Sequence, residues 1–195
     1  IREEICIGKK DANVWLNNAA LCHEKGIPTN CTMLYGHIEK PEHKVDHLLR
    51  LRALQDESLA SRKAHFLAYI PLAYQNENNE LSRKHVIHET TGVQDLREVA
   101  VARLLLDNIP HIKAYWVMIG TGLAQVGLHY GANDLDGTII EEEIAHNAGA
   151  TSPQALSKAE LVRFIEEAGF QALGRDNLYQ TYDLAPRAIA GFDAV

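Results

Sequence analysis

The stretch TMLYGHIEKPEHKVDHLLRLRALQDE, residues 32–57, joins a short apolar strand to a long amphipathic helix. The strand ends at Gly36, and Pro41 opens the helix, where a proline is well tolerated because its missing N–H is not needed in the first turn. Apolar side chains then recur at helical spacing. Between the two elements stand His37 and Glu39. The stretch therefore predicts a strand–helix unit with two chemically capable side chains at the end of its strand.

Strand and helix patterns alternate along the rest of the chain. The polar stretch 75–92 is predicted to be a connection, and connections of that length are often functional. Strands that are apolar along their length and alternate with helices indicate a parallel sheet covered by helices. The predicted strands are 27–36, 65–74, 111–120 and 134–140, and the predicted helices are 12–26, 41–57, 93–108, 121–132 and 157–169.

The fold class that follows is α/β. About four β/α units with a C-terminal helix match the second half of an eight-stranded barrel of the triosephosphate isomerase type. A small doubly wound sheet is the alternative, but no glycine-rich phosphate loop supports it. No linker or low-complexity segment divides the chain, so residues 1–195 are predicted to form a single domain.

Composition narrows the class of function. The 195 residues are 46% hydrophobic and 23% charged, with a formal net charge of −7. That balance argues against nucleic acid and anionic membranes as partners, because both select a basic face. No apolar run approaches the roughly 20 residues that span a bilayer, and the charged start IREEICIGKKD does not resemble a signal peptide. We expect a cytoplasmic enzyme domain.

No metal site is predicted in this chain. Cys6, Cys22 and Cys31 have no zinc or iron–sulfur spacing, and we expect them to be ordinary thiols. The ten histidines are scattered without a His-Glu-x-x-His motif. His43 and His47 are four residues apart, but the charged neighbours around them predict a solvated helix face. A Gly-x-Ser-x-Gly elbow is also absent from the sequence, which argues against a hydrolase.

Polar and aromatic side chains follow each predicted strand, at the edge where parallel α/β folds bind ligands. Each cluster has an ordinary structural explanation as well: a histidine caps a helix, asparagines form turns, and aromatic rings pack in a barrel. Their convergence on one rim favours a site. The clusters are Tyr35, Gly36, His37 and Glu39; Tyr74, Gln75, Asn76 and Asn78; Trp116, Met118 and Gly120; and Asp134, Asp136, Gly137 and Thr138.

Five segments together resemble a known family. They are TMLYGHIE, IPLAYQNEN, HIKAYWVMIG, GANDLDGTIIEEEIAHNAGA and GRDNLY. In order and separation they are similar to the C-terminal half of the aminofutalosine synthase family, radical S-adenosylmethionine enzymes of the futalosine route to menaquinone. The similarity runs from about residue 11 to residue 182. Cyclic dehypoxanthine futalosine synthase and the deazaflavin-forming synthase share the YGH and GAND motifs, whereas Asp136-Gly137-Thr138 and His146 favour aminofutalosine synthase.

The resemblance implies a place for S-adenosylmethionine. TMLYGHIE is similar to a superfamily strand of the form glycine-x-isoleucine-x-glycine-x-x-glutamate that lies beside the adenine. Leu34, Gly36 and Glu39 take the isoleucine, second glycine and glutamate positions, and a glycine lets the backbone approach a flat base closely. Thr32 stands where the superfamily strand has its first glycine, which is a departure from that pattern. His37 is then expected to face the reaction chamber.

The resemblance also implies a chemistry. A four-iron four-sulfur cluster cleaves S-adenosylmethionine to a 5′-deoxyadenosyl radical, which adds to the dicarboxylate 3-[(1-carboxyvinyl)oxy]benzoate, and aminodeoxyfutalosine results. Two carboxylates need cations or hydrogen-bond donors. The alternatives are a surface ion pair for Arg175 and a helix-terminal charge for His146. The expected substrate contacts are Tyr35, His37, Tyr74, Gln75, Asn78, Trp116, Asp136, Thr138, His146 and Arg175.

One departure from the family is decisive for this chain. The family holds its cluster with a Cys-x3-Cys-x2-Cys loop, which these 195 residues lack. The N-terminal, cluster-binding half is therefore expected to be missing, and half a barrel leaves two strand edges unpaired. We expect pairing with a separately encoded N-terminal half, self-association, or a longer gene product. The alternative function is a catalytically inactive half-barrel that binds a nucleoside or serves assembly.

Overall fold

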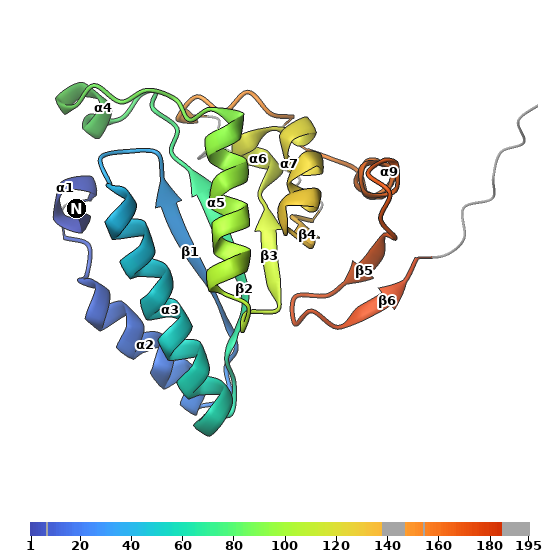
Figure 1. Ribbon diagram of the computed structural model, residues 1–195, viewed down its shortest axis with the longest axis horizontal. Coiled ribbons are helices and arrows are strands. Elements are labelled where there is room, and N and C mark those ends of the chain that lie inside the picture. The colour runs from blue at the N-terminus through green and yellow to red at the C-terminus, as the bar shows by residue number, and fades with distance from the viewer. Residues whose placement is uncertain (7, 138–146, 154, 185–195) are drawn as a thin grey trace, which may run out of the picture.

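The computed structural model describes residues 1–6, 8–137, 147–153 and 155–184 (Figure 1). Its centre is a parallel sheet with the strand order β1-β2-β3-β4. The predicted α/β class is confirmed at this level, because β1, β2 and β3 are each followed by helical structure. The strands are β1 (Thr29–Tyr35), β2 (Phe66–Ala73), β3 (His111–Ala114) and β4 (Asp134–Leu135).

Helices cover the sheet face that is toward the viewer in Figure 1, where α2, α3, α5 and α7 lie in front of the strands. A separate two-stranded antiparallel hairpin follows the last helix. The helices are α1 (Arg2–Ile5), α2 (Ala12–Glu24), α3 (Pro41–Ser61), α4 (Glu80–Lys84), α5 (Gly92–Leu105), α6 (Trp116–Ile119), α7 (Thr121–Gly127), the 3-10 turn η1 (Leu128–Tyr130) and α9 (Lys158–Glu167), and the hairpin strands are β5 (Leu173–Arg175) and β6 (Thr181–Asp183).

Local signals place the helix starts where the sequence predicts them. The Asp11 side chain accepts hydrogen bonds from the first turn of α2, at 2.8 and 3.0 Å. Pro41 is the first residue of α3. Ser157 and Glu160 form a reciprocal capping box at the start of α9. The Asp11 and Ser157 side chains satisfy backbone N–H groups that have no partner inside the helix, and Pro41 has no N–H that needs one.

The register of β1 and β2 separates a buried face from an open one. Cys31, Met33 and Tyr35 pair with β2 residues on the helix-covered side, and all three are buried. Because successive side chains of a strand alternate between faces, Thr32 and Leu34 belong to the opposite side. Thr32 is exposed and Leu34 is half-buried. The helix-covered face therefore holds the core.

Two predicted elements are wrong in extent. The strand predicted for 111–120 stops at Ala114, and Trp116 begins the one-turn helix α6, which Gly120 ends with a φ of +80°. An apolar run does not distinguish a buried strand from a buried helix, and Trp116 is buried either way. The connection 75–92 contains α4, which Asn79 caps. The hairpin after α9 was not predicted.

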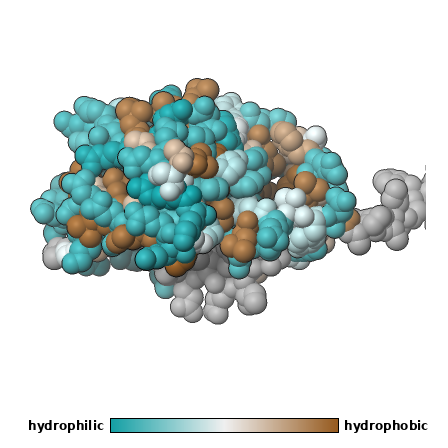
Figure 2. All heavy atoms as spheres, turned by 90° about the horizontal axis from the view of Figure 1, so that it is seen from below, coloured by the Kyte–Doolittle hydropathy of each residue, from teal (hydrophilic) through white to brown (hydrophobic). Residues whose placement is uncertain are grey.

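The view from below, onto the amino ends of the strands, shows the character of the surface (Figure 2). Over the described residues, hydrophilic side chains cover most of this face, and the apolar patches on it are small and separated. Among the described residues no helix is long and apolar enough to cross a membrane.

Candidate functional site

The polar clusters at the carboxyl ends of the strands meet, as predicted. Tyr74 donates its backbone N–H to the carbonyl of Tyr35 at 2.8 Å, which joins the first cluster to the second. The Gln75 side chain donates to the backbone oxygen of Met118 at 3.2 Å, and further contacts extend the rim to β4. The indole of Trp116 donates to the backbone oxygen of Asp136 at 3.3 Å.

The turn after β1 is built around the Glu39 carboxylate. Its two oxygens accept the backbone N–H groups of Gly36 and His37 at 2.7 and 2.8 Å. Gly36 has a φ of +87°, in the left-handed region that favours glycine. A Cβ at this position would lie 2.4 Å from a methyl carbon of Thr90. Backbone conformation and packing therefore both require glycine here.

The His37 ring is enclosed by the same turn. Its Nε2 lies 3.1 Å from the backbone oxygen of Leu34, and its Nδ1 lies 2.8 Å from the backbone N–H of Ile38 and 3.0 Å from Glu39. Burial lowers the pKa of His37, although Glu39 opposes the shift. With the ring neutral, Nε2 donates to Leu34 and Nδ1 accepts from Ile38.

Burial by itself would raise the pKa of the Glu39 carboxyl. The backbone N–H groups of Gly36 and His37 outweigh burial and lower the pKa below its ordinary value. Glu39 is therefore an ionised brace of the turn. Its oxygens are already engaged by the turn, so its clearest role is to shape the backbone that the ligand would meet.

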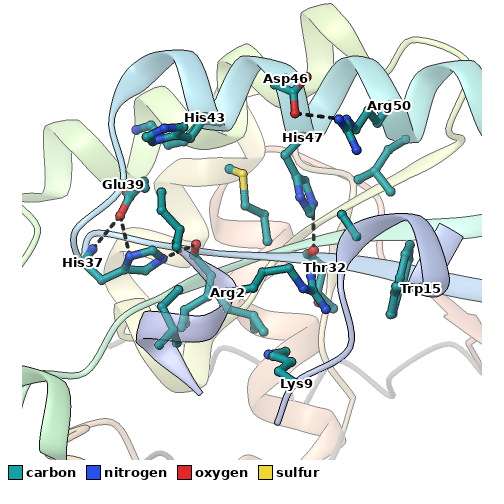
Figure 3. A pocket seen from close by; sticks show the side chains of 18 of the residues that line it. Arg2, Lys9, Trp15, Thr32, His37, Glu39, His43, Asp46, His47 and Arg50 are labelled. Carbon is teal, nitrogen blue, oxygen red and sulfur yellow. Dashed lines mark hydrogen bonds and ion pairs between the residues drawn. The ribbon is translucent and has the colours of Figure 1, made fainter. Parts of the chain in front are cut away.

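A groove of about 580 Å³, which we call the edge groove, runs along the outer edge of β1 (Figure 3). Its walls come from α1, α2, β1 and the first half of α3. Four Lys or Arg side chains and two carboxylates line it, a formal charge of +2 in a chain whose net charge is −7. The charged and histidine side chains are Arg2, Lys9, His37, Glu39, His43, Lys44, Asp46, His47 and Arg50.

A second cavity, of about 610 Å³, lies behind the same turn, between α3, α5 and residues 88–91. Helix α5 carries two buried carboxylates, Asp95 and Glu98, of which Glu98 lines the cavity. Asp95 accepts a hydrogen bond from the Tyr35 hydroxyl at 2.9 Å, and Glu98 pairs with Lys44. The two cavities thus share His37, Glu39 and Lys44 as a common wall.

Several predicted contact residues use their side chains inside the protein. Tyr35 is 2% exposed and lies under α5, so its placement does not support a substrate contact. Trp116 is buried. Tyr74 bonds with its hydroxyl to the Asn79 and Ser82 side chains, which fixes α4. Gln75 spans the carbonyls of Ala73 and Met118, and Asn78 donates to the backbone oxygen of Asn147 at 3.1 Å.

Arg175 is not at the rim. It lies at the opposite, amino end of the sheet, where it forms two hydrogen bonds with Asp134, the first residue of β4. The ring of Tyr179 lies 4.3 Å from the guanidinium and 4.1 Å from the ring of His111. Thr138 and His146, the remaining predicted contacts, lie outside the described residues.

Sequence analysis missed two residues that the structure brings forward. Lys113, nearly buried on β3, pairs with Asp136 and lies 3.8 Å from Asp134. It is the sole Lys or Arg between Arg103 and residue 158, a signal that the sequence does contain. His47 was predicted to be solvated, yet its Nε2 lies 3.0 Å from the backbone oxygen of Thr32.

The chain does not supply a metal cradle in its described part. No group of three or more His, Cys, Asp or Glu side chains among these residues is arranged to hold a metal ion. Cys6 is exposed beside α1, Cys22 is half-buried on α2, and Cys31 is buried on β1. Burial raises the pKa of Cys31 far above its ordinary value, so it is an unreactive thiol.

Comparisons with known proteins agree with this outline. Residues 63–188 match the family model described as the CofH/MqnC C-terminal region. An aminodeoxyfutalosine synthase of Thermus thermophilus is 51% identical over 92% of this chain and 47% of its own length, and one of Streptomyces coelicolor is 40% identical over the same shares. A 5-amino-6-(D-ribitylamino)uracil–L-tyrosine 4-hydroxyphenyl transferase of Methanopyrus kandleri is 41% identical over 92% of this chain and 48% of its length. The chain spans about half the length of the curated relatives it matches.

Proposed function

The chain belongs to the CofH/MqnC family, and on that basis we propose that it is the C-terminal part of an aminodeoxyfutalosine synthase. The observation that carries the proposal is the 51% identity with the Thermus thermophilus enzyme over 92% of the chain. The rim geometry supports it, since the Gly36 turn, the second strand end and β4 meet at one edge of the sheet.

S-adenosylmethionine and a four-iron four-sulfur cluster, when bound, supply a 5′-deoxyadenosyl radical that adds to 3-[(1-carboxyvinyl)oxy]benzoate on the way to aminodeoxyfutalosine. This chain's own residues would bind and orient the adenosyl group. Leu34 and Gly36 offer an apolar edge and a close backbone approach to the adenine, while Glu39 holds that backbone in shape.

The cluster does not fit the described residues, because the three cysteines are dispersed and differently buried. We therefore assign cluster binding to an N-terminal half that carries the Cys-x3-Cys-x2-Cys loop. The parallel sheet would be completed to a barrel by strands added at its outer edges. Self-association of this chain is the alternative way to cover those edges.

The dicarboxylate substrate would need cations, and the structure changes which side chain we favour. Arg175 is engaged by Asp134 at the far end of the sheet, so it is a weaker candidate than sequence alone suggests. Lys113 lies nearer the rim, through its pair with Asp136. A carboxylate such as Asp136 would repel the substrate unless Lys113 neutralises it.

A second candidate function has a specific observation in its favour. The Methanopyrus kandleri transferase is as similar to this chain, at 41% identity, as the Streptomyces coelicolor synthase is at 40%. The name of that transferase specifies a 4-hydroxyphenyl group, L-tyrosine and 5-amino-6-(D-ribitylamino)uracil, and it contains no benzoate. Activity of the deazaflavin-forming type is therefore the first alternative, with a catalytically inactive nucleoside-binding or assembly module as the next.

One assay separates these functions. The full-length protein would be reconstituted with iron and sulfide under anaerobic conditions and given S-adenosylmethionine, a reductant and each substrate set in turn. We expect aminodeoxyfutalosine by mass spectrometry from the benzoate substrate. A hydroxyphenyl-transfer product from tyrosine would instead establish the second function. Failure to cleave S-adenosylmethionine at all would leave the binding module.

A further inference from the structure

The outer edge of β1 presents backbone acceptors away from β2. The carbonyl of Tyr35 accepts from Tyr74, at the end of β2, so Tyr35 directs its backbone toward that neighbour. Backbone groups of successive strand residues point to alternate sides. The carbonyls of Thr32 and Leu34 therefore point to the outer edge, into the edge groove.

Both of these carbonyls are met by a histidine (Figure 3). His47 Nε2 lies 3.0 Å from the oxygen of Thr32, and His37 Nε2 lies 3.1 Å from the oxygen of Leu34. An uncovered strand edge is a template for pairing with another chain, and proteins commonly block such edges with side chains. The imidazoles of His47 and His37, which contact the two successive outward carbonyls, block the edge in this way.

The two histidines are held differently. The His37 ring is enclosed in the Gly36–Glu39 turn and has contacts at both nitrogens. His47 reaches β1 from the neighbouring helix α3, is only half-buried, and meets the strand through its Nε2. A change of side-chain rotamer would free the Thr32 carbonyl without disturbing the strand, whereas release of His37 would dismantle the turn.

We propose that His47 is an exchangeable cap on an interaction edge, which protects the Thr32 carbonyl here and releases it to a backbone N–H of a parallel strand from the N-terminal half. This inference rests on the proposed function for the identity of that strand. It assigns His47 a role in assembly that is separate from any contact with substrate.

The lining of the edge groove indicates the chemistry of the partner. Its formal charge of +2 stands against −7 for the whole chain, so acidic side chains are complementary to it. Trp15, Leu16 and Leu72 contribute apolar wall. The segment that fits is extended, with backbone N–H groups directed at β1 and a mixture of acidic and apolar side chains, as in β-strand addition.

The first test uses the 195-residue chain alone. His47→Ala uncovers Thr32, so we expect self-association to strengthen by roughly tenfold in sedimentation equilibrium. His47→Gln retains an N–H donor and should restore the wild-type constant. His129→Ala, on η1, is the matched control for loss of a histidine. Circular dichroism establishes that each variant is folded. Equal association of the His47→Ala, His47→Gln and wild-type chains would overturn the cap.

The second test adds the N-terminal half of the same gene as a separate chain. Because the cap competes with the incoming strand, His47→Ala should bind that half more tightly than wild type, by about threefold to tenfold in calorimetry. Weaker binding would mean that His47 contributes to the interface between the two halves, and would overturn the proposal that it leaves the Thr32 carbonyl on binding. If the wild-type halves do not associate at all, the proposed function fails, whereas the self-association test still decides whether the edge is capped.

Discussion

Arg175 holds Asp134 with two parallel hydrogen bonds, from Nε at 2.6 Å and from Nη2 at 3.0 Å, although the residues are 41 positions apart. Tyr179 adds a third bond to the same carboxylate at 3.0 Å. The contact joins the GAND motif at the start of β4 to the GRDNLY motif of the C-terminal hairpin. Two segments that first indicated the family are therefore partners in one structural joint.

Removal of this joint should destabilise the protein. Arg175→Ala leaves the Asp134 side chain, which is 8% exposed, without its bidentate partner. We expect a loss of about 2–3 kcal/mol in the free energy of unfolding, because charged hydrogen bonds of low exposure are lost. Urea unfolding at pH 7 measures it. Arg163→Ala breaks an exposed pair with Glu167 and should cost less than about 1 kcal/mol.

If Arg175→Ala unfolds with wild-type stability, the joint does not support the hairpin. In that case Arg175 returns as a candidate for the substrate carboxylate. The full-length enzyme then separates the two roles, because loss of a substrate contact would raise KM without a change in stability.

Gly36 should tolerate no side chain. Gly36→Ala places a Cβ at a φ of +87° and 2.4 Å from Thr90, so we expect more than about 2 kcal/mol of destabilisation. Thr90→Ser removes the obstructing methyl group and should recover part of the loss when combined with it. Gly122→Ala is the matched control. It lies in α7 with open space around it and should be neutral or stabilising by about 0.5–1 kcal/mol. Equal effects at the two glycines would contradict this account of the turn.

The starts of the helices and the position of the rim were predictable from the sequence, whereas the end of β3 was not. Asp11, Pro41 and Ser157 begin their helices because capping and proline geometry depend on a few adjacent residues. The rim was also predictable, because parallel strands deliver their following residues to one edge. The end of β3 at Ala114 was not, since the apolar run continues through α6 and tertiary packing decides its conformation.

The side-chain roles required the structure. Tyr35 stands at the end of its strand, as a rim residue would. Its side chain, however, lies on the strand face under α5 and bonds to Asp95. His47 looked solvated because its neighbours in sequence are charged, and its contact is with a strand 15 residues earlier. Long-range pairs of this kind leave no local pattern, which is why the contact between Arg175 and Asp134 was not predicted.

Glu39 should make the turn sensitive to acid. Its folded pKa lies below the ordinary value of 4.5, so the ionised carboxylate contributes its full stability above that pH. The contribution is lost as the pH falls below 4.5 through the folded pKa. Glu39→Gln should cost about 1–2 kcal/mol at pH 7, because it removes the negative charge and one of the two oxygens that accept the backbone N–H groups. The difference between the two proteins should shrink as the pH is lowered from 6 to 3 in urea unfolding. A difference that is constant over this range would show that Glu39 is not ionised in the turn.

His23 should lower the stability of the protein in acid as well, and at a higher pH than Glu39 does. The ring is fully buried, with Nδ1 2.8 Å from the Ser58 hydroxyl, Nε2 2.9 Å from the Thr29 hydroxyl, and an edge contact with Phe66. Burial, aided by Arg62 and a neighbouring histidine, lowers the pKa of His23 below its ordinary 6.5. Below pH 6.5, His23 therefore binds a proton in the unfolded chain more readily than it does in the folded protein.

The sign of the effect follows from this difference in proton binding. Stability is complete above pH 6.5 and declines as the pH falls toward the folded pKa, by up to about 1.4 kcal/mol per pH unit for one histidine. Burial lowers the pKa of His37, His47 and His111 as well, and each adds a decline of the same sign. His23→Gln isolates one contribution, since it should unfold with a shallower pH dependence between pH 7.5 and 5.5. Titration of the His23 ring by proton NMR measures its pKa in the folded protein directly. An ordinary pKa near 6.5 would contradict this prediction.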